Sequence, residues 1–164
     1  LAVLALCVLV VVSGCKPKTQ NGGGGGSSSD VPEFTFITNG PADFWNHSEA
    51  GCRKAEKDFG VKVTFQRPTG LTDQIRMLED LMTRGTDGVA VTSMDPANQT
   101  EVLNKVAEST ALVTHDSDAP DSNRLVYIGM DNYDAGWMDG ELVLKAITDG
   151  GKIGLFIGLM DQDN

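Results

Sequence analysis

Carboxylates, amides and aromatic rings gather in short polar segments, each placed directly after a short apolar run. Aromatic faces pack against the C–H face of a sugar ring, while carboxylates and amides bind its hydroxyl groups. Neutral polyols are the ligands that need both kinds of side chain at once. The candidate ligand-binding residues, in chain order, are Phe44, Trp45, Asp116, Asp118, Asp131 and Asn132.

Each of these residues also has a purely structural interpretation. Phe44 could belong to the core, whereas Trp45, at the start of a helix, is less easily buried. Asp116 and Asp118 could be turn residues or helix caps, and Asp131-Asn132 could form a turn. We keep both interpretations open at this point.

Metal and enzyme chemistry find little support in the sequence. The acidic residues lack the glycine and final glutamate of a calcium loop. Two histidines, His47 and His115, lie far apart, and Cys52 has no cysteine neighbour for a zinc site. No Gly-x-Ser-x-Gly, phosphate loop or Gly-x-Gly-x-x-Gly occurs. We therefore expect no metal, no cofactor and no enzyme activity.

Short apolar runs alternate with segments of helical spacing, which predicts the elements that position these residues. Glycine follows two of the predicted helices, at Gly60 and Gly85, and Thr72 is expected to cap the second helix. The expected strands are 34–38, 61–65, 88–92, 111–114, 125–128 and 152–157, and the expected helices are 44–59, 72–84, a segment from Pro96, and 133–148.

This alternation predicts the α/β class with a doubly wound parallel sheet, covered by helices on both faces. In such sheets ligands bind outside the carboxyl ends of the strands. The candidate residues all follow strands, so the fold gathers them at one edge.

Net charge argues against two classes of partner. The chain carries −10 overall, and only Lys16 and Lys18 are basic before Asp30. A nucleic-acid binder needs a cationic surface, and so does a protein held to anionic lipid by basic patches. We expect neither.

The N-terminus is typical of a targeting signal. Residues 1–12 are almost wholly apolar, and Val12-Ser13-Gly14-Cys15 resembles the lipobox of bacterial lipoproteins. That resemblance implies lipidation at Cys15 after a signal sequence over 1–15. The glycine- and serine-rich segment 16–32 is expected to be a flexible tether.

From Phe34 onward the chain resembles the N-terminal half of a periplasmic sugar-binding protein of the ribose/galactose type. Four segments carry the resemblance: Phe44-Trp45, the stretch from Leu78 to Val89, Thr114 to Asp118, and Ile128 to Gly136. The resemblance implies a type I periplasmic-binding-protein fold of two lobes, with the first at 33–131 and the start of an incomplete second at 132–164.

The same resemblance implies roles for particular residues. Phe44, Trp45 and Asp116 match sugar ligands, and the first hinge crossing falls at Met130 and Asp131. This chain departs from the ribose pattern in two places: Ala42-Asp43 precedes the aromatic pair instead of Asn-Pro, and Ser117 stands where an arginine is expected.

The expected function is capture of a monosaccharide or related polyol outside the cytoplasm, for delivery to an ABC permease. The protein would be held in the cell envelope by its lipid anchor alone. Three alternatives remain: a sugar-sensing lipoprotein that docks on a signalling receptor, the effector domain of a sugar-responsive repressor, and an enzyme on a doubly wound sheet. The signal and tether favour sugar capture for a permease over the repressor domain and the enzyme.

Overall fold

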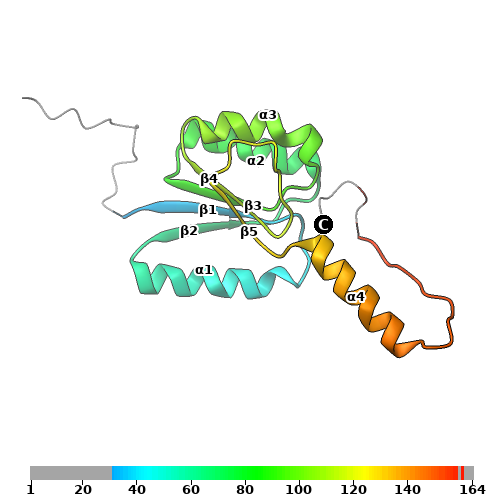
Figure 1. Cartoon of the computed structure of the whole chain (residues 1–164). Helices are drawn as coiled ribbons and strands as arrows, with labels where there is room; N and C mark the ends of the chain where they lie inside the picture. Colours follow the sequence, from blue (N-terminus) through cyan, green and yellow to red (C-terminus); the bar gives the residue numbers. More distant parts are fainter. Residues whose placement is uncertain (1–30, 159, 161–164) are drawn as a thin grey trace, which may run out of the picture.

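The structure, a computed structural model, describes residues 31–158 and 160 (Figure 1). The expected signal sequence with Cys15, and the expected tether up to residue 30, lie outside the described residues. Strands and helices follow one another as β1 Glu33–Ile37, α1 Trp45–Phe59, β2 Lys62–Gln66, α2 Leu71–Arg84, β3 Gly88–Val91, α3 Pro96–Ala107, β4 Ala111–His115, β5 Val126–Ile128 and α4 Asn132–Ala146.

The strands form one parallel sheet in the order β2-β1-β3-β4-β5. Figure 1 shows α2 and α3 on one face of this sheet and α1 on the other. The predicted doubly wound α/β class is therefore confirmed. Because all strands run in one direction, their carboxyl ends meet at one edge, where the candidate residues follow them.

The main core lies between the sheet and the pair α2–α3. Strands contribute Ile37, Val89 and Val91, and helices contribute Leu78 and Leu103, all nearly inaccessible to solvent. The opposite face is covered less completely. There α1 packs against β2, so the surface of β3, β4 and β5 beside α1 has no helix over it in the described part of the chain.

Helix ends follow the predicted glycine stops, with one difference at a helix start. Gly60 has φ +65° and donates to Glu56 O, and Gly85 has φ +79° and donates to Leu81 O. The predicted cap at Thr72 is wrong, since α2 begins at Leu71 after Gly70. Asp73 instead closes the first turn, because its carboxylate accepts from the Thr69 amide at 3.0 Å.

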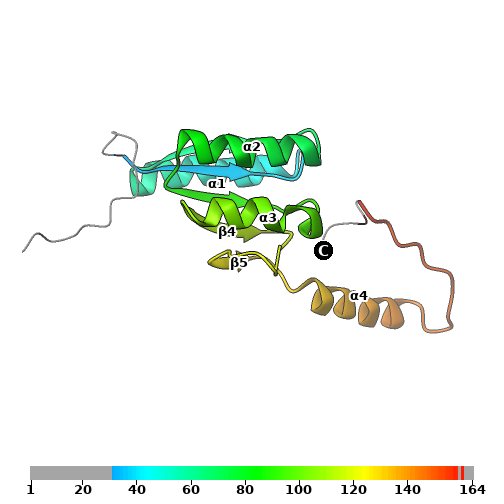
Figure 2. The same cartoon turned by 90° about the horizontal axis from the view of Figure 1, so that it is seen from above.

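Beyond β5 the chain leaves the sheet, as Figure 2 shows. Helix α4 contains no buried residue. The strand predicted at 152–157 is wrong: this segment pairs with no strand among the described residues, and Leu155 and Phe156 are 84% and 99% exposed. A strand exists only through a ladder of hydrogen bonds to a neighbour, so apolar sequence alone did not suffice.

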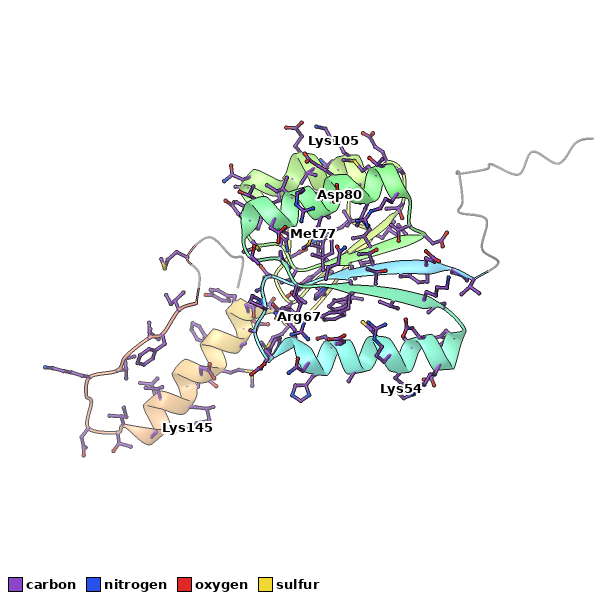
Figure 3. The ribbon with its side chains drawn as sticks, turned by 180° about the vertical axis from the view of Figure 1, so that it is seen from behind. Lys54, Arg67, Met77, Asp80, Lys105 and Lys145 are labelled. Atoms are coloured by element: carbon purple, nitrogen blue, oxygen red, sulfur yellow. The ribbon has the colours of Figure 1, made fainter. Side chains whose placement is uncertain are left out.

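The outer helix surfaces carry balanced charge. In Figure 3 the labelled Lys54 lies on the outside of α1, while Asp80 and Lys105 lie on the outer surfaces of α2 and α3. Lys54 pairs with Asp58, and Lys105 pairs with Glu101. None of the helices in residues 31–158 is long and apolar enough to cross a bilayer.

Candidate functional site

A groove of about 900 Å³ opens at the carboxyl ends of β1, β4 and β5 and continues along the sheet beside α1. We call its opening at the strand ends the strand-end corner; it is lined by Phe44, Trp45, His115, Asp116 and Asn132. The rest of the lining is almost entirely apolar. The corner therefore combines aromatic, carboxylate and amide groups, and four of its five residues are predicted site residues.

The burial of the two aromatic residues is the reverse of the expectation. Trp45 is 3% exposed, whereas Phe44 is 63% exposed, so the expectation that Trp45 would be the less buried is wrong. The Trp45 ring meets Phe36 edge-on, and its Nε1 donates to Asn39 Oδ1 at 2.9 Å. This bond satisfies the indole N–H and so permits burial.

Phe44 lies on the edge of the buried indole. Its ring is nearly perpendicular to that of Trp45, with centroids 5.0 Å apart. Because Phe44 precedes α1 and most of its ring is open to solvent, it presents an apolar face at the groove mouth, supported from beneath by Trp45.

Asp116 has an unusual backbone. It is the one non-glycine residue of the described chain with positive φ, at +61°. The Ser117 amide donates to His115 O at 2.7 Å, which closes a tight three-residue turn with Asp116 at its centre. Such backbone strain costs about 1–3 kcal/mol and is concentrated at functional sites. Partial burial raises the pKa of the Asp116 carboxyl.

Asp118 occupies a different environment from Asp116. Its oxygens accept from Arg124 Nε and a terminal Arg124 nitrogen, at 2.5 and 2.6 Å, and from Thr114 Oγ1 and the Ala119 amide. Burial opposes ionisation of Asp118, but these donors outweigh it and lower its pKa. With four donors already bound, this carboxylate holds the loop after β4 together and is not among the groove-lining residues.

The predicted site residues after β5 also have different roles in the structure. Asp131 caps α4, because its carboxylate accepts from the Asp134 amide at 3.0 Å, and this matches its structural interpretation. Asn132 begins α4 and lines the groove, as does Met130. The hinge role expected at Met130 and Asp131 stays a prediction.

His115 forms the floor of the strand-end corner, although the sequence analysis did not place it among the ligand-binding residues. Its ring stacks on Phe36 at 4.1 Å, faces the edge of Trp45, and meets Thr92 Oγ1 through Nδ1 at 2.9 Å. Burial lowers the pKa of His115 to about 4, although the carbonyls of Ile37 and Ala90 partly oppose this shift. The imidazole is therefore neutral at physiological pH.

Two buried glutamines connect the loops behind the corner. Gln74 Nε2 donates to the carbonyls of Thr38 and Thr92, which follow β1 and β3. Gln99 Nε2 donates to Gln74 Oε1 at 2.6 Å, and Gln99 Oε1 accepts from Ser93 Oγ at 2.9 Å. The sequence signal was available: Gln74 lies one turn before Leu78 on the inward stripe of α2.

No group of three or more histidine, cysteine or acidic side chains within residues 31–158 is arranged to hold a metal ion. The polar groups of the strand-end corner are instead a carboxylate, an amide and a neutral imidazole. Together with aromatic faces, such groups suit a small ligand that has both hydroxyl groups and an apolar side.

Comparison with known proteins defines the family. A family profile described as "Periplasmic binding protein domain" matches residues 34–164. The chain belongs to this family, whose fold is the observed parallel sheet with flanking helices. It is a family of binding proteins and not of enzymes, and membership implies an extracytoplasmic location. No curated protein sequence matches significantly.

Solved structures agree with this assignment. An ABC transporter solute-binding protein from Burkholderia graminis, in complex with D-arabinose, is similar with a TM-score of 0.77 and 27% identity, over 84% of this chain and 48% of that one. GanP, a glucose-galactose binding protein from Geobacillus stearothermophilus, gives 0.68 and 27%, over 73% and 44%.

XylFII, solved in complex with LytSN, gives a TM-score of 0.67 and 26% identity, over 71% of this chain and 44% of that one. The chain thus spans about half the length of these similar structures. Their similarity agrees with the family assignment, and the ligand and partners of this chain are matters for proposal.

Proposed function

We propose that this protein binds a monosaccharide at the strand-end corner, between this lobe and a second one, and delivers it to an ABC permease. One observation supports the proposal most strongly: the strained Asp116, whose pKa is raised by partial burial, lies in the same groove as the exposed ring of Phe44. Binding proteins for D-arabinose and for glucose and galactose share the fold.

Each corner residue has a distinct part in this proposal. Phe44 supplies the apolar face for one side of the sugar ring, and Trp45 holds Phe44 in place. Asp116 accepts hydrogen bonds from two neighbouring hydroxyl groups, and Asn132 donates or accepts a further one. Asp118 and Asp131 hold their loops and do not contact the sugar.

Lobe closure expels water from Asp116 and strengthens its hydrogen bonds to hydroxyl groups. A hydrogen bond to a charged group contributes about 1.5–3 kcal/mol. A carboxylate that forms two such bonds therefore raises the affinity for the sugar well over tenfold. The closed state is favoured only by contacts that the sugar makes across both lobes.

Calorimetry with D-arabinose, D-galactose and D-glucose tests this proposal, using the protein expressed from its complete reading frame. Asp116→Ala should weaken binding by more than tenfold, whereas Glu101→Ala, on the exposed side of α3, should leave it unchanged. The proposal fails if none of the sugars binds, or if Asp116→Ala binds as tightly as the wild type.

Membrane attachment is a separate part of the proposal. The lipobox-like Val12-Ser13-Gly14-Cys15 and the glycine-rich tether support lipidation at Cys15. Cells supplied with a radioactive fatty acid should label the wild-type protein but not Cys15→Ala. Equal label in both would overturn the anchor and leave sugar binding untouched.

A further inference from the structure

Tyr127, in β5, lies between the turn at Asp116 and the segment after β5. Its Oη is 2.6 Å from Asp116 O and 3.2 Å from Met130 O. A phenol has one proton to donate. The shorter distance gives that proton mainly to Asp116, while Met130 O lies within reach as a second acceptor.

The backbone of Asp116 is held by β5 on both sides. Its amide donates to Ile128 O at 3.2 Å, and its carbonyl accepts the Tyr127 hydroxyl. The strand register explains this arrangement, because Thr114 pairs with Tyr127 and His115 pairs with Ile128. A strained backbone persists only where its surroundings hold it, and Tyr127 is the side chain that bonds the Asp116 carbonyl.

Gly129 leaves room for the phenol at this position. A Cβ atom built on Gly129 would lie 2.1 Å from Tyr127 Oη and 2.2 Å from the nearest ring atom, Cζ. The phenol therefore lies directly over the Gly129 backbone, and any side chain at this position would displace it. The missing side chain of Gly129 therefore permits the position from which Tyr127 Oη reaches both carbonyls.

From these contacts we infer that Tyr127 is a positioning residue: it holds the Asp116 turn in the conformation that turns its carboxylate to the sugar, and it ties that turn to Met130. This inference rests on the proposed function. It adds a link between the ligand carboxylate and the segment where the hinge crossing is expected.

The test is a double-mutant cycle, measured by calorimetry with D-arabinose, D-galactose and D-glucose on the protein from its complete reading frame. Tyr127→Phe should weaken binding about three- to tenfold, the value of one hydrogen bond. In the Asp116→Ala background the same change should alter affinity less than about twofold, because its target carboxylate is gone. Tyr133→Phe, an exposed phenol on α4, is the matched control and should bind as the wild type does.

A second pair of variants keeps the test decisive if Tyr127→Phe folds poorly. Gly129→Ala should displace the phenol and weaken binding to a similar degree. Gly136→Ala, where an added Cβ meets no atom within 4 Å, should not. Amide exchange at Ser117 should accelerate in Tyr127→Phe and Gly129→Ala, while exchange at Val91 stays unchanged.

The outcomes separate the two proposals. If the wild type binds a sugar and Asp116→Ala loses it, but Tyr127→Phe and Gly129→Ala bind normally, the positioning role is wrong and the proposed function stands. Equal losses from Tyr127→Phe in both backgrounds would also overturn the positioning role. If the wild type binds none of the sugars, both proposals fail.

Discussion

The carboxylates of Asp116 and Asp118, two positions apart, have opposite environments. Asp118 is neutralised by Arg124 and its pKa is lowered, whereas Asp116 lies in the groove with its pKa raised by burial. The sequence could place both after the fourth strand, but it could not tell them apart. That distinction depends on Arg124, which folds back from a loop whose path is not encoded in any local pattern.

Backbone strain at Asp116 predicts an order of stability between two variants that both lack the carboxylate. At φ +61° a Cβ atom costs about 1 kcal/mol, and glycine avoids this cost. Asp116→Gly should therefore have its unfolding midpoint at a higher urea concentration than Asp116→Ala. Both variants should lose the same affinity for the sugar. A lower midpoint for Asp116→Gly would contradict the strained geometry.

His115 predicts a loss of stability as the pH falls. Its pKa is about 4 in the folded protein and 6.5 in the unfolded chain. Between these values the unfolded state binds more protons, so the free energy of unfolding decreases as the pH falls from about 6.5 to about 4. The full loss is about 3 kcal/mol, and it persists below pH 4, where both states are protonated.

Urea unfolding of the wild type and His115→Gln at several pH values measures this effect. The wild type should lose more stability than His115→Gln over that pH range. His47→Gln, which removes the exposed histidine of α1, should follow the wild type. Parallel pH profiles for wild type and His115→Gln would contradict the burial of a neutral imidazole.

At the scale of elements, the sequence predicted the helices and the paired strands of residues 31–158 within one or two residues at most ends. The spacing of apolar residues and the glycines at helix ends were enough to predict these elements. Each helix on the sheet buries an apolar stripe, and strands β1, β3 and β4 have buried faces. The strand predicted at 152–157 failed because pairing needs a partner, which no local pattern reveals. The prediction that Trp45 would be less buried than Phe44 failed because burial of the indole depends on its hydrogen bond to Asn39.

The Gln74–Gln99 pair predicts a large stability effect without any change at the ligand. Gln74→Leu leaves the Thr38 and Thr92 carbonyls and Gln99 without their donors or acceptor, at a cost of about 2–4 kcal/mol. Urea unfolding should show this loss, whereas Glu79→Leu, on the exposed side of α2, should change stability by less than about 0.5 kcal/mol. Equal effects would contradict the network.

At the scale of the whole molecule, α2 and α3 close one face of the sheet, while α1 covers the other face only beside β2. The groove beside α1 exposes the rings of Phe34 and Phe59, which are 37% and 76% accessible. Contiguous apolar surface of this kind favours association and dye binding. The 164-residue chain should therefore enhance the fluorescence of an apolar dye and associate as its concentration rises.

Matched variants locate that surface. Phe59→Ser, in the groove, should lower dye fluorescence and association by sedimentation. Phe156→Ser, at an exposed position outside the groove lining, should lower them much less. A chain that stays monomeric and does not increase the fluorescence of the dye would show that the groove is covered in solution.

Tryptophan fluorescence tests the central claim, that a sugar binds at the strand-end corner, most directly. Residues 1–164 contain two tryptophans, so Trp137→Phe, with any tryptophan outside these residues also changed to phenylalanine, leaves Trp45 as the sole reporter. Trp45 lines the groove beside Phe44. Titration of this variant with the sugar that binds in calorimetry should give a saturable fluorescence change with the same Kd. Calorimetric binding without any change in Trp45 emission would contradict the placement of the sugar at this corner.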